Sequence, residues 1–379
     1  MKKSVLRKSL ALVLTLLMML SLASCGANSS GGSSSSQPSQ PAQSGDASSD
    51  VGSASAKTPE YNLKMSGTVT EDHLVTQTER FFVEKVEELS EGRIHIDLYP
   101  ANQLGDPRSM LEATSMGNND IVECGNPIYA NFSNQLKFFN LPFLFDNRDA
   151  AYAFMDTEQG QVIRKQIESD VGVHILGLID NGFFTFTSNM DIKTPNDVKG
   201  YKIRCQESDV LLQIWTDLGA SPLPMSFTEV YTALQQGAID GQMNGYITNY
   251  NSGYYEVQKY TTSLGLLFDV CPLSINADLY YSMPEDLRAV LDEAGAQMQS
   301  YCIERAREEN ARCRDGCIEN GMVINDLNDD ASRAPWIEKA QATYEWFRSS
   351  FPEVDLDAIL KTVDELNTQY AASTADEVL

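Results

Sequence analysis

Histidine and tryptophan are scarce in this chain, which has three of each among 379 residues. The chain also has no nucleophile elbow, P-loop, zinc-binding helix or dinucleotide fingerprint. The three histidines are His73, His95 and His174, and we expect neither a bound metal nor a cofactor. The missing motifs argue against an enzyme, although Asp and Glu are numerous enough for a carboxylate pair to arise by chance.

Basic residues are outnumbered, with 28 Lys and Arg against 53 Asp and Glu. Four of them, Lys2, Lys3, Arg7 and Lys8, lie within the first 25 positions, so the rest of the chain is still more acidic. Such a surface argues against binding to nucleic acid or to anionic lipid. An anionic ligand would have to be held by a local cation and not by the overall field.

Long hydrophobic runs are missing after the N-terminus. The apolar run from Leu10 to Leu22 follows the basic residues and is too short to span a bilayer comfortably, which is typical of a secretory signal. It ends in Leu22-Ala-Ser-Cys25, which resembles a bacterial lipobox, where small residues precede a cysteine that receives a diacylglycerol. We predict an exported protein anchored through lipid on Cys25, at the outer face of the cytoplasmic membrane or in the periplasm. The alternative is an ordinary signal peptide with a chance cysteine.

Large apolar residues are almost absent from residues 26–58, where Ser, Gly, Pro and Gln dominate. This composition cannot bury a core, so we expect a disordered tether. A flexible chain of this length has a root-mean-square reach of roughly 30 Å. Such a tether suits a soluble module that is held near a membrane partner.

Six cysteines remain after Cys25: Cys124, Cys205, Cys271, Cys302, Cys313 and Cys317. An even count in an exported protein permits disulfides, but a chain of this size has no need of a disulfide framework. Cys313 and Cys317 lie four apart on a predicted helix, where a disulfide would be strained. Free thiols are the prediction that we carry forward.

Strand and helix patterns alternate through the rest of the chain, which is typical of a layered α/β fold. In the first half we expect strands near residues 63–66, 94–98, 120–124 and 173–178, with helices near 73–90, 106–116 and 150–169. Capping boxes at Ser226 and Ser282 predict helices that begin there. The second of these helices could run to Asn320, roughly 50 Å at 1.5 Å per residue. Further helices are expected near 334–349 and 355–370.

Residues 194–244 are the most informative stretch. A strand at 201–206 carries Arg204 near its carboxyl end, a helix follows at 208–218, and Asp240 to Asn244 returns toward the sheet. This order predicts parallel strands with helical crossovers. Ligands in open α/β sheets bind at the carboxyl ends of the strands. Arg204 and Asn244 should therefore lie on the same rim.

The chain resembles the substrate-binding proteins of tripartite ATP-independent periplasmic (TRAP) transporters, the DctP-like family. The likeness covers about residues 64–326. The motifs that carry it are Leu98-Tyr-Pro100, Gln103-Leu-Gly-Asp106, Val198-Lys-Gly200, Lys202-Ile-Arg204, Gly219-Ala-Ser-Pro222, Pro224-Met-Ser-Phe227, Glu229-Val-Tyr231, Ala233-Leu-Gln235, Asp240-Gly-Gln242, Tyr255-Glu-Val-Gln-Lys-Tyr260 and Met283-Pro-Glu-Asp-Leu287.

The resemblance implies a two-lobed α/β fold like that of periplasmic binding proteins, with a ligand cleft between the domains and a long helix that links both. We expect domain I to comprise residues 59–181 and 270–309, and domain II residues 182–269 and 310–379, after a signal peptide at 1–25 and a linker at 26–58. The resemblance also implies a small-molecule carboxylate ligand, a permease with small and large membrane subunits as partner, and a monomeric protein.

The family's site residues map onto particular positions here. By resemblance Arg204 grips the substrate carboxylate, since a guanidinium is a planar fork of donors that stays charged; the alternative is a structural arginine in a surface ion pair. Asn244 aligns with an asparagine that shares the carboxylate, unless it is only a turn residue before Gly245. Phe227 aligns with an aromatic residue that packs on the ligand, or it caps a helix. Tyr246 could line the cleft or only pack.

Departures from the family pattern bear on the ligand. Many members carry a second arginine where this chain has Phe184. Contacts from the first domain should come from near Thr68 and Cys124, a region that lacks the charged side chains expected in sialic-acid-type members. One arginine in a neutral, aromatic site suits a monocarboxylate or a modest organic acid, with hydroxyl or apolar groups.

The sequence thus predicts an extracytoplasmic solute-binding protein of a TRAP transporter that captures a small organic acid and delivers it to the permease. The nearer alternative is a solute-binding lipoprotein that serves an ATP-driven importer or a sensor. A secreted, lipid-anchored hydrolase is the enzymatic alternative.

Overall fold

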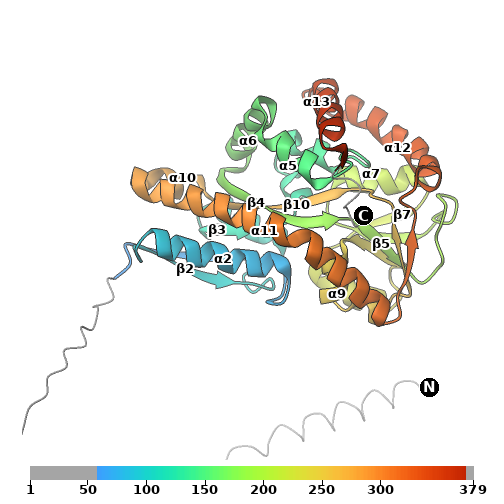
Figure 1. Ribbon diagram of the computed structural model, residues 1–379, viewed down its shortest axis with the longest axis horizontal. Helices are drawn as coiled ribbons and strands as arrows, with labels where there is room; N and C mark the ends of the chain where they lie inside the picture. The colour runs from blue at the N-terminus through green and yellow to red at the C-terminus, as the bar shows by residue number, and fades with distance from the viewer. Residues whose placement is uncertain (1–57, 373–379) are drawn as a thin grey trace, which may run out of the picture. The chain divides into compact units, whose positions relative to one another are not determined.

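The computed structural model describes residues 58–372, which fold around two mixed β-sheets (Figure 1). The first sheet has the order β2(Ile94–Tyr99)-β1(Tyr61–Ser66)-β3(Ile121–Glu123)-β10(Phe268–Asn276)-β4(Val173–Phe183). β1 is parallel to β2 and β3, whereas β10 runs antiparallel to both of its neighbours. The predicted strands of the first half are confirmed, and β4 extends beyond the expected end at residue 178.

The second sheet has the order β11(Val323–Asp326)-β9(Tyr260–Ser263)-β5(Thr185–Ser188)-β8(Gly241–Asn244)-β6(Lys202–Cys205)-β7(Ser221–Pro224). β6 is parallel to β7 and β8, as the alternation of residues 194–244 predicted. Arg204 faces Gln242 in the register of β6 and β8, so Arg204 and Asn244 lie at the same end of neighbouring strands. We call the parts of the molecule built on the first and second sheets the first and second lobes.

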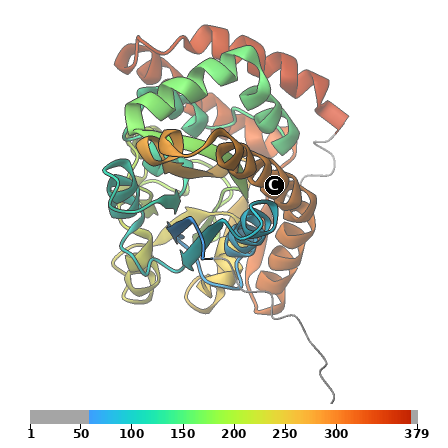
Figure 2. The same cartoon turned by 90° about the vertical axis from the view of Figure 1, so that its left-hand side faces the viewer.

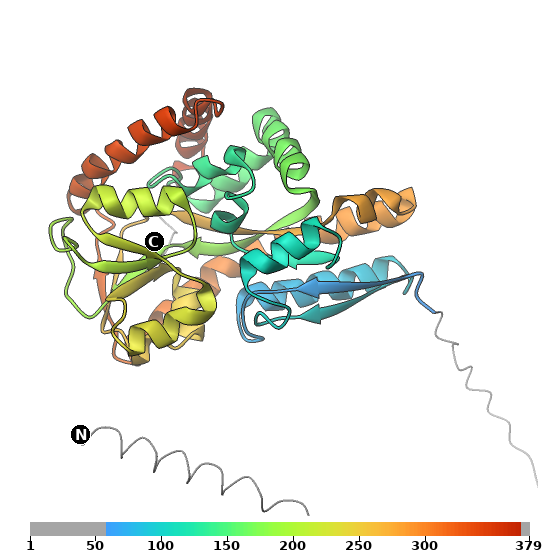
Figure 3. The same cartoon turned by 180° about the vertical axis from the view of Figure 1, so that it is seen from behind.

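Helices cover both lobes. α2(Leu74–Leu89) packs on β2, and α3(Pro107–Ser115) packs on β3, where Asp106 caps it by accepting from the Ser109 N–H. α7(Asp209–Leu218) covers the second sheet beside β7 and β6 (Figure 3). The shorter helices are α4(Asn126–Tyr129), α8(Val230–Gln235), α9(Tyr246–Asn251) and α10(Ala277–Ser282).

One expected helix is two helices in the structure. α5(Arg148–Asp156) ends and α6(Glu158–Val171) begins at Thr157, whose side chain accepts from the Gly160 N–H. Gly160 also lies so close to the end of α5 that a Cβ there would be 2.1 Å from the Phe154 carbonyl oxygen. The break therefore depends on a cap and on a close approach that helical periodicity does not reveal.

Both predicted capping boxes are wrong. Ser226 precedes a 3₁₀ turn and makes no side-chain cap bond to it, because its hydroxyl lies 3.3 Å from that of Thr228. Ser282 is the last residue of α10 and donates to the Leu279 carbonyl. The long helix α11(Glu285–Glu319) begins after Pro284 and is 35 residues long.

α11 connects the two lobes, as the family resemblance implied. It packs against α2 and β4 of the first lobe and against α9 of the second (Figures 1 and 2). The chain crosses between the lobes where β4 leads into β5, and it returns where β9 leads into β10. Gly295 brings α11 directly onto β4, since a Cβ at this position would be 2.1 Å from the Leu176 carbonyl oxygen.

The C-terminal helices divide between the lobes. α12(Asp330–Ser350) packs on α7 of the second lobe, whereas α13(Leu356–Gln369) packs on α5. The expected boundaries between domain I and domain II, at residues 181/182, 269/270 and 309/310, stay a prediction. Residues 1–57, with the expected signal peptide, Cys25 and most of the linker, lie outside the described residues.

All six cysteines after position 25 are buried and free. Within residues 58–372, no helix combines the length and the apolar character needed to cross a membrane.

Candidate ligand-binding site

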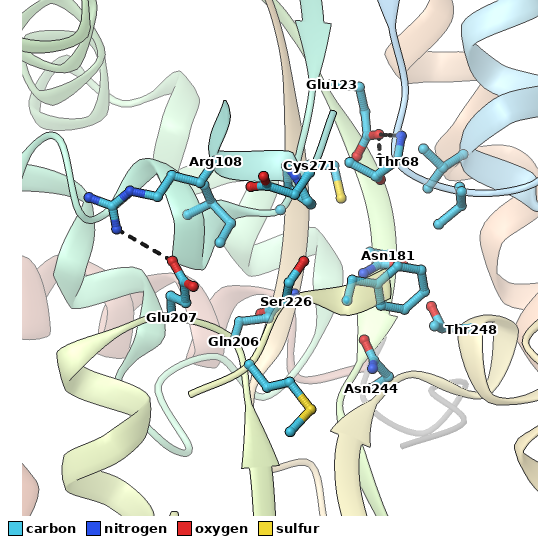
Figure 4. Close-up of a pocket in the computed structure, with 18 of the residues that line it drawn as sticks. Thr68, Arg108, Glu123, Asn181, Gln206, Glu207, Ser226, Asn244, Thr248 and Cys271 are labelled. Atoms are coloured by element: carbon cyan, nitrogen blue, oxygen red, sulfur yellow. Dashed lines mark hydrogen bonds and ion pairs between the residues drawn. The ribbon is translucent and has the colours of Figure 1, made fainter. Parts of the chain in front are cut away.

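A cavity lies between the two lobes, where strand ends of both sheets meet (Figure 4). It contains about 630 Å³ of space not occupied by protein atoms, part of it open to solvent. The lining residues are Thr68, Val69, Val75, Asp106, Pro107, Arg108, Glu123, Gly125, Ile128, Asn181 and Cys271 from the first lobe and the crossing strands, and Arg204, Gln206, Glu207, Met225, Ser226, Phe227, Asn244 and Thr248 from the second lobe.

Arg204 lines this cavity from β6 and is only 1% exposed. Its Nε donates to the Met225 carbonyl at 3.0 Å, whereas its Nη1 is buried without a hydrogen-bond partner among residues 58–372. No carboxylate of the described chain lies within ion-pair distance of it. Burial lowers the pKa of Arg204, but a guanidinium remains charged in proteins. The site thus holds a desolvated cation whose forked end is available to an anion.

Asn244 lines the cavity beside Arg204, and a relay of amides fixes its orientation. Its Nδ2 donates to Gln242 Oε1 at 2.5 Å, and Gln242 Nε2 donates to Asn249 Oδ1 at 2.9 Å. Asn249 Nδ2 in turn donates to Thr185 Oγ1 and faces the backbone carbonyl of Asn244 at 3.4 Å.

A carbonyl can only accept, so it fixes the direction of the whole relay. Asn249 must turn its nitrogen to the carbonyl, Gln242 must turn its nitrogen to Asn249, and Asn244 must turn its nitrogen to Gln242. The side-chain oxygen of Asn244 is therefore the atom left for the cavity, and Figure 4 shows this side chain pointing into it. Asn244 therefore turns its acceptor oxygen to the cavity, and one of its two N–H donors is used by Gln242.

Glu123 forms the opposite wall, at the end of β3. Its Oε2 accepts from the Thr68 N–H at 3.0 Å and from the Thr68 hydroxyl at 2.7 Å. Its Oε1 is buried with no hydrogen-bond partner among the described residues. Burial raises the pKa of Glu123, while the Thr68 donors and the weak Cys271 thiol donor lower it.

A second buried carboxyl, Glu79 of α2, lies behind this wall. Both of its oxygens are buried without a hydrogen-bond partner in the described chain, and a Cβ on Gly67 would be 2.5 Å from Oε1. Burial first, and the nearby charge of Glu123 second, raise the pKa of Glu79 well above its ordinary value. Glu79 is therefore the member of the pair that is held neutral.

The rim of the cavity is polar. Arg108 of α3 contacts Glu207 of the second lobe at 3.4 Å and also pairs with Glu112. Deeper inside, His73 Nδ1 accepts from the Val75 N–H, so Nε2 carries the proton and donates to Thr248 across the lobes at 3.2 Å. Burial lowers the pKa of His73 to about 4, which keeps it neutral.

Four of the predicted site residues are brought together here: Arg204, Asn244, Phe227 and Thr68. The other three, Phe184, Cys124 and Tyr246, are fully buried and do not line the cavity. Alternation along an extended strand explains the case of Cys124, because neighbours point to opposite faces. Glu123 and Gly125 face the cavity, and Cys124 faces the core.

Several lining residues were missed from the sequence, chiefly Glu123, Asn181, Gln206 and Thr248. The region near Cys124 was expected to lack acidic side chains, yet Glu123 stands one position earlier. The period of two in β3 was the signal that could have found it. Asn181 and Thr248 carry no local sequence signal, because the crossing strand and α9 bring them to the cavity from far along the chain.

Comparison with known proteins identifies the family. The family model for bacterial extracellular solute-binding proteins of family 7, DctP, matches residues 65–350. The C4-dicarboxylate-binding periplasmic protein DctP of Rhodobacter capsulatus is 30% identical over 281 residues, which covers 73% of this chain and 83% of that protein. The 2,3-diketo-L-gulonate-binding periplasmic protein YiaO of Escherichia coli is 26% identical over 76% of this chain and 87% of that protein.

Solved structures have the same fold. A TRAP periplasmic solute-binding protein from Shewanella oneidensis with bound succinate superposes with a TM-score of 0.76 at 28% identity, over 82% of this chain and 100% of that chain. The sugar acid binding protein DctPAm from Advenella mimigardefordensis, in complex with galactonate, gives a TM-score of 0.78 at 24% identity, over 82% and 99%. The family match, the two lobes and the cavity between them together place this chain in the DctP family of TRAP extracellular solute-binding proteins.

Proposed function

We propose that this chain binds a small organic acid in the cavity between its lobes, with Arg204 as the carboxylate-binding residue. The observation that carries the proposal is the burial of Arg204 without an acidic partner in the described chain. A buried, uncompensated charge is costly, so a protein that keeps one has a use for it. A ligand carboxylate would complete the unpartnered end of the guanidinium with strong, charge-assisted hydrogen bonds.

The ligand is a monocarboxylate at this site. Arg204 is the cation that the deep part of the cavity offers, because Arg108 stands at the rim and is already paired with Glu112 and Glu207. Phe184 occupies the position of a second arginine in many relatives and is buried in the core. Asn244, Phe227 and Thr68 complete the contact surface, with Phe227 half-buried against the ligand space.

Binding favours the closed arrangement, since a ligand between the lobes contacts both at once. The closed protein then presents its surface to a permease of small and large membrane subunits. The energy for transport comes from an ion gradient across that permease. The chain itself acts as a monomer that binds without catalysis, and lipid on Cys25 holds it outside the cytoplasmic membrane.

The direct test is to identify the ligand and then remove its partner. Mass spectrometry of small molecules released from the purified protein should detect an organic acid with one carboxylate. Calorimetry should then show that Arg204→Lys weakens its binding about 100-fold, because a point charge cannot replace a forked pair of hydrogen bonds. Glu87→Gln, an exposed change on α2 outside the cavity lining, is the control. An unchanged affinity in Arg204→Lys would refute the assigned role, and turnover of an ester or glycoside would favour the hydrolase alternative.

A further inference from the structure

We propose that Glu123 selects the ligand at the end opposite its carboxylate, and that the ligand carries hydrogen-bond donors there, as hydroxyl or ammonium groups, in place of a second carboxylate. The inference rests on the proposed function and narrows its substrate class. It concerns a residue at the end of β3 in the first lobe, which lines the same cavity as Arg204 and lies on the side away from Asn244 (Figure 4).

The geometry of Glu123 leaves one oxygen for a ligand. Thr68 satisfies Oε2 twice, through its backbone N–H and its hydroxyl. Oε1 is buried without a hydrogen-bond partner in the described chain, and the carboxyl, which lines the cavity, has the Cys271 thiol beside it as a weak donor. Leaving a buried carboxyl oxygen unpaired costs free energy, and a ligand donor would remove that cost.

Two more lining residues add acceptors on the ligand side. The amide relay through Gln242 and Asn249 turns the side-chain oxygen of Asn244 toward the cavity. The Oε1 of Gln206 is also buried without a partner among residues 58–372. The cavity lining thus combines one cation, Arg204, with a set of oxygen acceptors. The complementary molecule has one carboxylate and several N–H or O–H groups.

A second carboxylate fits this wall poorly. It would approach the oxygens of Glu123 and Asn244 with like charge or with acceptor against acceptor. Burial raises the pKa of Glu123, and the Thr68 donors oppose that shift. A hydroxyl can donate or accept, so it satisfies Oε1 whether or not the carboxyl carries a proton, and an ammonium does so when Glu123 is ionised.

The test is calorimetry on the full chain with matched acids that differ only at the far end. One series is butyrate, 4-hydroxybutyrate, 4-aminobutyrate and succinate, and a second pair is D-galactonate and galactarate. We expect the hydroxy or amino acid to bind at least about tenfold more tightly than butyrate and succinate, and galactonate more tightly than galactarate. The relative affinities of 4-hydroxybutyrate and 4-aminobutyrate show whether the site prefers a hydroxyl or an ammonium group.

Glu123→Gln should reduce that preference to less than about threefold, while Glu87→Gln, an exposed change on α2, leaves it unchanged. If the Glu123 variant fails to fold, the ranking in the unmodified protein still decides. Tightest binding of succinate or butyrate, or of galactarate over galactonate, overturns the inference and leaves the proposed function standing. Binding of none of these acids contradicts the proposed function itself, and the inference falls with it.

Discussion

Arg204 shows at the level of one side chain how a binding site differs from a core. A buried cation without an anion costs several kcal/mol of desolvation that nothing in the ligand-free protein returns. The molecule holds a second fully buried arginine, Arg148, but that one lies 3.1 Å from the buried carboxylate of Asp180. The two residues have the same burial and opposite electrostatic situations, so they make a matched pair for mutation.

Arg204→Met should leave the ligand-free protein as stable as before or about 1–2 kcal/mol more stable, because it removes an uncompensated buried charge. Arg148→Met should lower the free energy of unfolding by about 3–5 kcal/mol, because it leaves Asp180 buried and without that counter-charge. Urea denaturation of both variants, free of ligand, measures the difference. A large loss of stability in Arg204→Met would mean that Arg204 is structural.

The buried carboxyl of Asp269 should make the free energy of unfolding depend on pH. Burial raises the pKa of this carboxyl from 3.8 to about 7, although Asn181 donates to it at 2.8 Å. Between these two values the folded state binds more protons than the unfolded state, so this group makes stability fall as pH rises. The loss should approach about 4 kcal/mol by pH 8.

Asp269→Asn should flatten that part of the curve, since an amide does not ionise and can still accept from Asn181. Urea denaturation at pH 5 and pH 8 gives the two points for each protein. Part of the fall will remain, because burial raises the pKa of Glu79 and of Glu123 in the same direction. A variant that loses as much stability as the parent protein over this interval would show that Asp269 is ionised when folded.

At the level of elements, hydrophobic periodicity together with capping and turn residues predicted most helices and strands to within a few residues. The end of α7 at Gly219 and the start of α3 at Asp106 have residues suited to their caps. The errors fall where tertiary contacts decide. Thr157 divides one amphipathic run into two helices, and Ser282 belongs to the end of α10 and not to the start of α11.

The site was predictable to the extent that it follows from strand order. Arg204 and Asn244 end neighbouring parallel strands of one βαβαβ segment, residues 202–244, so the sequence of that segment was enough to bring them together. Glu123 depends on which face of β3 turns to the cavity, and Phe184 depends on how β4 leads into β5. Neither can be deduced without the packing of the whole lobe.

Gly295 offers a test of how α11 rests on the sheet. Helix propensity alone predicts that Gly295→Ala stabilises the protein by about 1 kcal/mol. The added Cβ, however, would lie 2.1 Å from the Leu176 carbonyl oxygen of β4, where backbone cannot yield easily. We expect the close contact to prevail and the variant to lose about 1–3 kcal/mol.

The control for Gly295→Ala is Ser300→Ala, an exposed change on the same helix that should alter stability by no more than about 0.5 kcal/mol. Urea midpoints of the two variants can be compared directly. A gain in Gly295→Ala would mean that α11 can move away from β4 at little cost, which would make it a less rigid connection between the lobes.

At the level of the whole molecule, several contacts join the two lobes around the cavity. Arg108 and Glu207 meet across the rim, Lys137 pairs with Asp209, and His73 bonds to Thr248. The rim pair is exposed, with side-chain exposures of 46% and 39%, and exposed pairs contribute at most about 1 kcal/mol. The rim pair therefore adds little to closure, and we expect ligand contacts to both lobes to supply free energy for it.

Small-angle X-ray scattering should therefore detect a smaller radius of gyration when the protein is saturated with its acid than when it is ligand-free. Arg204→Lys should show no compaction at the same ligand concentration, because the contact that joins ligand to the second lobe is weakened. Glu207→Gln should compact normally and lose less than about fivefold in affinity, since it removes only a screened rim pair. Equal radii with and without ligand in the unmodified protein would mean that closure does not depend on binding. The cavity would then capture the ligand without movement of the lobes.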